Sequence, residues 1–173
     1  YWINRRYFFM GKALKYTYFP NWNLRLFKHK LGRYEKITDL PTDSGDHEIH
    51  EHVVVQGSTG RLKSIMDHHA FPTIESFVEK HNRYSNWEAI VENEQKEKAD
   101  LIQHDGVKLK RKLRMVFRQL PFRPTVRFLY VYIWQKGFLD GWAGYVFARL
   151  HGQYEFLSVA KTKEVAKSKN ESR

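Results

Sequence analysis

Histidine and carboxylate side chains are concentrated between Asp46 and Ala70, in the stretch DHEIHEHVVVQGSTGRLKSIMDHHA. Imidazole and carboxylate groups are ordinary ligands of divalent metals, and a carboxylate can also serve as a general base. The stretch does not contain the zinc-protease motif, which needs two histidines four residues apart on one helical face. On a strand, alternation would place Glu48 and His50 on one side and Glu51 on the other. Spacing alone therefore favours a polar segment near solvent over a metal site.

Composition limits the classes of partner. The chain has 173 residues, a formal net charge of +11, 16% aromatic residues and no cysteine. This length suffices for one domain with a core, and the lack of cysteine excludes a disulfide framework or a cysteine metal site. Positive charge with many aromatic residues indicates nucleic acid, an anionic membrane surface or phosphorylated small molecules as partners. The first residues, YWINRRYFFM, begin inside an apolar pattern, so we expect the chain to be part of a longer protein.

Residues 1–72 carry strand and turn signals. NLRLFKH alternates in side-chain character and predicts a strand, whereas TDLPTDSGD is rich in turn-forming residues and predicts a loop. HVVVQGSTGRLKSIMDHH predicts a strand, a turn and a returning strand. We therefore expect short strands within residues 24–29 and 50–68.

The period of the apolar residues changes from two to 3.6 after the sequence FPTI. Ile74, Phe77, Val78 and His81 fall at helical spacing, and Thr73 is a suitable N-cap for this helix. We expect a mostly helical region over 73–163 and a polar tail over 164–173 that frays. The predicted fold class is α+β, with strands in 1–72 and helices after them.

Residues 107–139 contain nine Lys or Arg residues and no Asp or Glu. KLKRKLRMVFRQL places its apolar residues on one helical stripe, which is typical of a basic amphipathic helix on a membrane surface. The candidate membrane-surface residues are Lys110, Arg111, Lys112 and Arg114. The charge also permits a nucleic-acid-binding module without catalysis, although no nucleic-acid-binding motif is present and nucleic acid is the less favoured partner.

An ordered series of motifs gives a more specific interpretation. PNWNLRLFKH, IHEHVVVQGSTG, KHNRYSNWEA and GFLDG follow one another with spacings that resemble the C-terminal half of a bacterial family 2 glycosyltransferase. The subgroup that the chain resembles builds lipopolysaccharide core, capsule or exopolysaccharide. The resemblance implies a partial GT-A domain with acceptor-side strands, followed by a mostly helical region. It also implies inverting transfer from a nucleotide-sugar to a glycan or lipid-linked acceptor, with Mg²⁺ or Mn²⁺, at the cytoplasmic face of the plasma membrane.

The resemblance assigns roles to single residues. Glu51 occupies the family's general-base position, and His68 matches a histidine that contacts the metal or the diphosphate. Arg25 is a candidate diphosphate ligand, because a guanidinium matches phosphate geometry. Trp22 and His50 are further candidates for substrate binding, although core packing is the favoured interpretation of Trp22.

The chain departs from the family pattern in two ways. His69 stands where the family usually has tyrosine, and no Asp-x-Asp motif occurs in the sequence. We therefore expect the chain on its own to be inactive and to bind nucleotide-sugars weakly. Asp140, in FLDG, is interpreted as a helix cap or turn residue rather than a catalyst.

Overall fold

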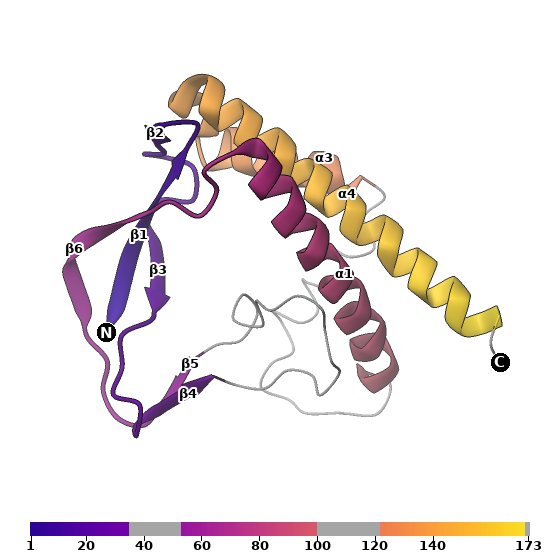
Figure 1. Cartoon of the computed structure of the whole chain (residues 1–173), viewed down its shortest axis with the longest axis horizontal. Helices are drawn as coiled ribbons and strands as arrows, with labels where there is room; N and C mark the ends of the chain where they lie inside the picture. Colours follow the sequence, from indigo (N-terminus) through magenta and orange to yellow (C-terminus); the bar gives the residue numbers. More distant parts are fainter. Residues whose placement is uncertain (35–52, 100–121, 172–173) are drawn as a thin grey trace.

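The computed structural model describes residues 1–34, 53–99 and 122–171, with 94–99 described as backbone only. Its strands precede its long helices, which confirms the predicted α+β class (Figure 1). Six of the residues assigned above lie outside the described residues: Glu51, His50, Lys110, Arg111, Lys112 and Arg114.

One strand organises the main sheet. β1 (Trp2–Phe9) pairs antiparallel with β2 (Lys12–Ala13) and β3 (Asn21–Leu24), and parallel with β6 (Arg61–His68). β4 (Gly32–Tyr34) and β5 (Val53–Val55) form a separate two-stranded sheet. The sequence pattern did not reveal β1, because polar side chains interrupt its aromatic residues.

Two strand predictions need correction. The predicted pairing of the VVV strand with the following strand is wrong, because β5 pairs with β4 and β6 pairs with β1. The predicted strand over 24–29 is displaced, since β3 ends at Leu24. Alternation shows which residues share a face, whereas the choice of a partner depends on contacts with distant segments.

The helical region begins where the sequence predicts it. α1 (Ile74–Ala99) follows Thr73, whose Oγ1 accepts a hydrogen bond from the Ser76 amide at 3.0 Å. This confirms the N-cap. Of the predicted apolar stripe, Phe77 and His81 are buried, whereas Ile74 is 44% exposed.

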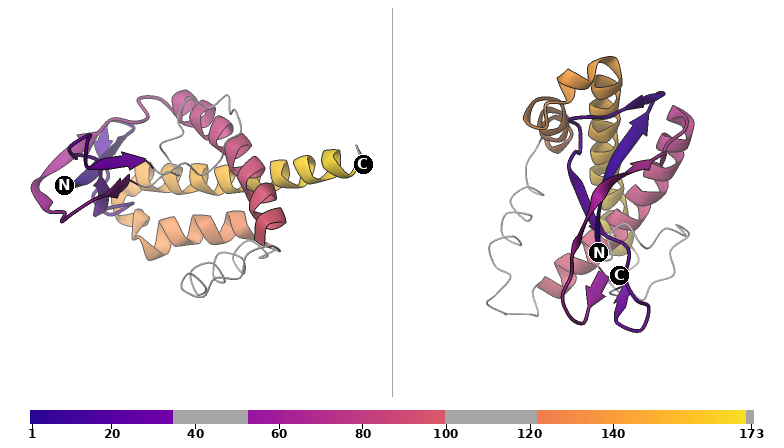
Figure 2. Two further views of the ribbon diagram at one scale, coloured as in Figure 1. Left: turned by 90° about the horizontal axis from the view of Figure 1, so that it is seen from below. Right: turned by 90° about the vertical axis from the view of Figure 1, so that its left-hand side faces the viewer.

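The C-terminal helices form a hairpin that packs against α1. α3 (Arg123–Leu129) continues into the π-helical turn η3 (Tyr130–Trp134), and the short 3₁₀ helix η4 (Gly137–Asp140) precedes α4 (Gly141–Glu171). α4 runs on past the other helices (Figure 2). It ends at Glu171, so the described part of the tail predicted to fray is helical. Within the described ranges, no helix has the length and apolar character needed to cross a membrane.

Three phenylalanines join the sheet to the helices. Phe9 of β1, Phe77 of α1 and Phe147 of α4 are each 1% exposed. Their ring centroids lie 5.2 to 6.0 Å apart in edge-on arrangements. Such aromatic pairs add about 0.5–1.5 kcal/mol each beyond the burial of their surface. This cluster fixes the distance between the sheet and the two long helices.

A buried ion pair holds the helices together. Arg123 donates to Glu155 Oε1 from Nε at 2.8 Å and from Nη2 at 2.6 Å, and its Nη1 lies 3.6 Å from Glu92 Oε1. Because these residues belong to α3, α4 and α1, one guanidinium connects three helices.

Asp140 connects the start of α4 to the loop after β2. Its Oδ1 accepts the Lys15 amide at 2.8 Å, and its Oδ2 accepts the Thr17 amide and Oγ1, each at 2.8 Å. Oδ2 also accepts the Tyr16 amide at 3.2 Å. Asp140 is the last residue of η4, and the partners of its carboxylate lie more than 120 residues away in the sequence, so it joins distant segments rather than capping a helix locally.

Replacing Asp140 with Asn should destabilise the fold, because an NH₂ group would face backbone N–H donors. We expect a loss of about 2–4 kcal/mol in the free energy of unfolding, measured by urea denaturation. Asp67→Asn is the matched control, since Asp67 is an exposed partner of Arg6. That change should cost less than about 1 kcal/mol. Equal losses in the two variants would contradict a structural role for Asp140.

Candidate functional site

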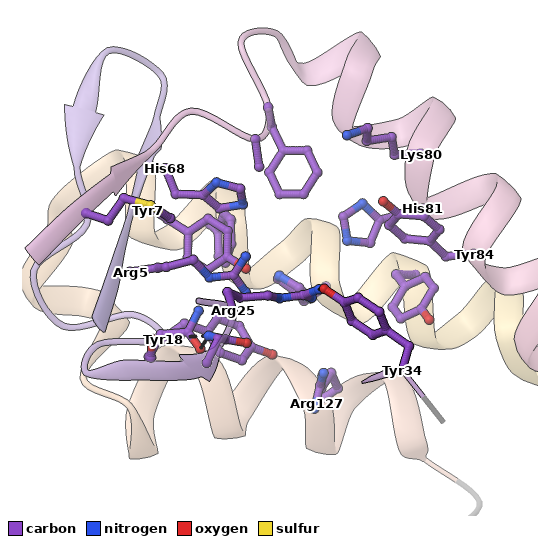
Figure 3. A pocket seen from close by; sticks show the side chains of 18 residues that line it. Arg5, Tyr7, Tyr18, Arg25, Tyr34, His68, Lys80, His81, Tyr84 and Arg127 are labelled. Carbon is purple, nitrogen blue, oxygen red and sulfur yellow. Dashed lines mark hydrogen bonds between the residues drawn. The ribbon is translucent and has the colours of Figure 1, made fainter. Parts of the chain in front are cut away.

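A cavity of about 650 Å³ lies between one face of the sheet and helices α1, α3 and α4 (Figure 3). Strand register decides which side chains reach it. The parallel pairing of β1 and β6 sets Arg5 beside Met66 and Tyr7 beside His68, and the antiparallel pairing sets Arg5 beside Asn21. All five side chains line the cavity. They belong to three strands that are consecutive in the sheet.

The intervening residues point the other way. Arg6 and Asp67 form an ion pair at 2.7 Å and do not line the cavity. Trp22 is also absent from its wall, and the guanidinium of Arg61 lies 5.1 Å from the Trp22 ring. The predicted substrate-binding role of Trp22 therefore gains no support from this cavity.

The cavity is rich in positive charge. Arg5, Arg25, Lys80 and Arg127 line it, and none of the described lining residues is Asp or Glu. Figure 3 shows the side chains of Arg5 and Arg25 reaching into the cavity from the strand side. Like charges in a partly enclosed space raise the local potential and favour a polyanionic ligand.

Several polar atoms in the wall lack partners. Among the described residues, the buried Nε of Arg5, Nε of Arg127, hydroxyl of Tyr18 and Nδ1 of His151 accept or donate no hydrogen bond. Each of these residues lines the cavity. Buried polar atoms without partners are rare and call for an explanation. Since Nε of arginine and the tyrosine hydroxyl are donors, a ligand with acceptor oxygens would satisfy them.

Arg25 is held in place by Tyr34 of β4. Its Nη1 donates to the Tyr34 hydroxyl at 2.8 Å, and its guanidinium lies 5.6 Å from the centre of the Tyr34 ring. This contact directs the guanidinium into the cavity (Figure 3). The structure thus places a predicted diphosphate ligand among three other cations.

The histidines of the cavity favour the neutral form. Burial lowers the pKa of His81 to about 4, despite a bond to the Phe77 carbonyl that opposes this. Burial, together with Arg127, lowers the pKa of His151 well below its usual value. Partial burial and the nearby Arg5 lower the pKa of His68. The charge of the cavity therefore comes from arginine and lysine.

Within the described residues, His68 has no companion ligands for the metal role predicted for it. In the described parts of the chain, no group of three or more His, Asp or Glu side chains could hold a metal ion. The ring of His68 instead lies 5.1 Å from the Tyr7 ring, and His69 stacks on Phe8. The described residues thus do not supply a metal site by themselves.

Sequence reasoning identified Arg25 and His68 but missed Arg5 and Arg127. Alternation in WINRRYFF could have shown that Arg5 shares a face with Tyr7. No comparable signal marks Arg127, whose place in the wall depends on the packing of α3. Comparisons with family models, with curated proteins and with solved structures found no match for the chain.

The low pKa of His81 predicts a pH dependence of stability. The unfolded chain binds a proton near pH 6.5, but the folded chain does so only near pH 4. The free energy of unfolding should therefore fall as the pH decreases through this window, by at most about 1.4 kcal/mol per pH unit from this residue. Urea denaturation at several pH values would measure the slope.

His81→Phe keeps a ring on Phe77 and removes the titrating group, so it should reduce this slope. His29→Phe, at an exposed histidine, is the control and should leave the slope unchanged. An NMR titration midpoint of His81 near 6.5 would contradict the prediction.

Proposed function

We propose that the chain is the acceptor-side and C-terminal part of an inverting glycosyltransferase that uses a nucleotide-sugar. The observation that carries the proposal is the cavity with four cations and no described carboxylate. A nucleotide-sugar presents a diphosphate, and guanidinium groups bind phosphate oxygens through charge-assisted hydrogen bonds. Two residues from the family-like motifs, Arg25 and His68, line this cavity together.

The proposed reaction needs a base and a way to stabilise the leaving group. A carboxylate takes the proton of the acceptor hydroxyl, whose oxygen attacks the anomeric carbon from the side opposite to the diphosphate. The bond between that carbon and the diphosphate oxygen breaks, and the diphosphate leaves with the electron pair. In this chain the arginine and lysine side chains of the cavity would offset its charge. Mg²⁺ or Mn²⁺ would need ligands from outside the described residues.

Pyrophosphate binding tests the cavity without requiring turnover. We expect weak binding at low salt by isothermal calorimetry, and Arg5→Gln should weaken it about tenfold by removing a charged donor. Arg6→Gln is a matched control, because Arg6 is the next residue on β1 and faces away from the cavity. If both changes weaken binding equally, pyrophosphate is attracted by net charge and the cavity is not its site.

Kinetics of a protein that joins this chain to its nucleotide-binding half would test the catalytic assignment. Glu51→Gln keeps the size of the side chain but cannot accept the proton, so kcat should fall by about 10²–10⁴-fold with donor affinity nearly unchanged. Glu48→Gln is the control from the same segment. If Glu48→Gln abolishes activity while Glu51→Gln is near normal, the base is assigned to the wrong residue.

A further inference from the structure

Large apolar side chains are exposed where the C-terminal hairpin turns. Ile133 and Trp134 of η3, Phe138 and Leu139 of η4 and Trp142 of α4 form what we call the aromatic corner. Trp134 is 79% exposed, Trp142 is 65% exposed and Ile133 is 58% exposed. The corner lies at the same end of the molecule as the β1–β2 hairpin (Figures 1 and 2).

Ring contacts connect two members of the corner, Phe138 and Trp142, through Tyr132 and Tyr145. Tyr132 lies 6.3 Å from Phe138 and 5.7 Å from Tyr145, measured between ring centroids. Tyr145 in turn stacks on Trp142 at 5.3 Å. Large exposed apolar side chains gathered at one turn of the chain mark an interaction site.

The segment that carries the corner is poor in acidic residues. Asp140 is the single acidic residue in the sequence from 122 to 154. Its carboxylate is directed at the backbone amides of Lys15 and Thr17. The neighbouring surface is basic, since Lys15 and Lys136 line a second cavity of about 430 Å³ together with Trp134.

We propose that the aromatic corner docks into the interface of an anionic membrane, with Lys15 and Lys136 binding lipid phosphates. Tryptophan and tyrosine favour the headgroup level of a bilayer, and lysine beside them is attracted to anionic lipids. This inference concerns a different surface from the cavity lined by Arg5, Arg25, Lys80 and Arg127, which we call the cationic cavity, so it does not depend on the proposed function.

Two other occupants fit the corner less well. A second copy placed by two-fold symmetry would bring Lys15 and Lys136 of both copies into one interface, where like charges would repel. A nucleic acid would stack bases on the rings but would leave the aliphatic side chains of Ile133 and Leu139 without a suitable contact.

Docking at the corner has a consequence for the larger cavity. The second cavity shares Tyr18 and Asn21 with the cationic cavity. A phosphate held at Lys15 and Lys136 would therefore lie close to the larger site. Membrane docking would keep that site beside the lipid surface.

Co-sedimentation with vesicles tests the apolar part of the proposal. The chain should bind vesicles of phosphatidylcholine with phosphatidylglycerol, and Trp134→Ser with Trp142→Ser should weaken binding about tenfold or more. Phe156→Ser is the matched control, because Phe156 is 58% exposed on α4 and lies about 21 Å along the helix from Trp142. Circular dichroism would verify that the variants are folded. Equal sedimentation of the double tryptophan variant and the unchanged chain would overturn the proposal.

Substitution of the lysines tests the electrostatic part of the proposal independently. Lys15→Gln with Lys136→Gln should weaken binding to the anionic vesicles by about fivefold per lysine, and added salt should reduce this difference. Lys63→Gln with Lys163→Gln removes the same charge from exposed positions on β6 and α4 and should have a smaller effect. If the two pairs weaken binding equally, net charge alone drives it and the proposed phosphate contacts are wrong. If light scattering shows a dimer that the tryptophan changes dissociate, the surface is a contact between copies and the membrane assignment is overturned.

Discussion

The contact between Asp140 and the loop after β2 is the constraint on which the rest of the arrangement depends. One carboxylate accepts three backbone amides and a hydroxyl from residues 15–17, and so ties the N-terminal sheet to the start of α4. The chain then continues directly into Tyr18 and Asn21, which line both cavities. The same contact engages the one carboxylate of residues 122–154 in hydrogen bonds. A single hydrogen-bonded carboxylate thus influences both the site and the neighbouring surface.

The cationic cavity has a high electrostatic cost. Four cations line it without a described carboxylate, and several buried donors in its wall have no partner within the described chain. The Phe9–Phe77–Phe147 cluster, of which Phe147 lines the cavity, and the buried pair of Arg123 with Glu155 supply opposing stability. Because the surrounding packing fixes the wall, the positively charged side chains stay close together despite their mutual repulsion. A bound polyanion would offset this repulsion.

The two surfaces complement each other in the proposed activity. The cationic cavity would hold the diphosphate of a nucleotide-sugar, and the aromatic corner would hold the molecule on an anionic bilayer. Both rely on excess positive charge, but they use it differently. In the cavity, arginine offers directed hydrogen bonds at partly buried positions, whereas at the corner exposed lysines act as hydrated charges beside apolar rings.

The sequence by itself determined the α+β class and the change to helix at Thr73, because these follow from local periodicity and capping. The order of its motifs also singled out Arg25 and His68 as candidate site residues. It did not determine the central strand β1, the parallel partner of β6 or the pairing of β5 with β4. It also gave no sign that Arg5 and Arg127, more than a hundred residues apart, share a cavity. Only the tertiary structure decided these, because strand pairing and cavity walls arise from contacts between distant segments, whose energies local patterns do not encode.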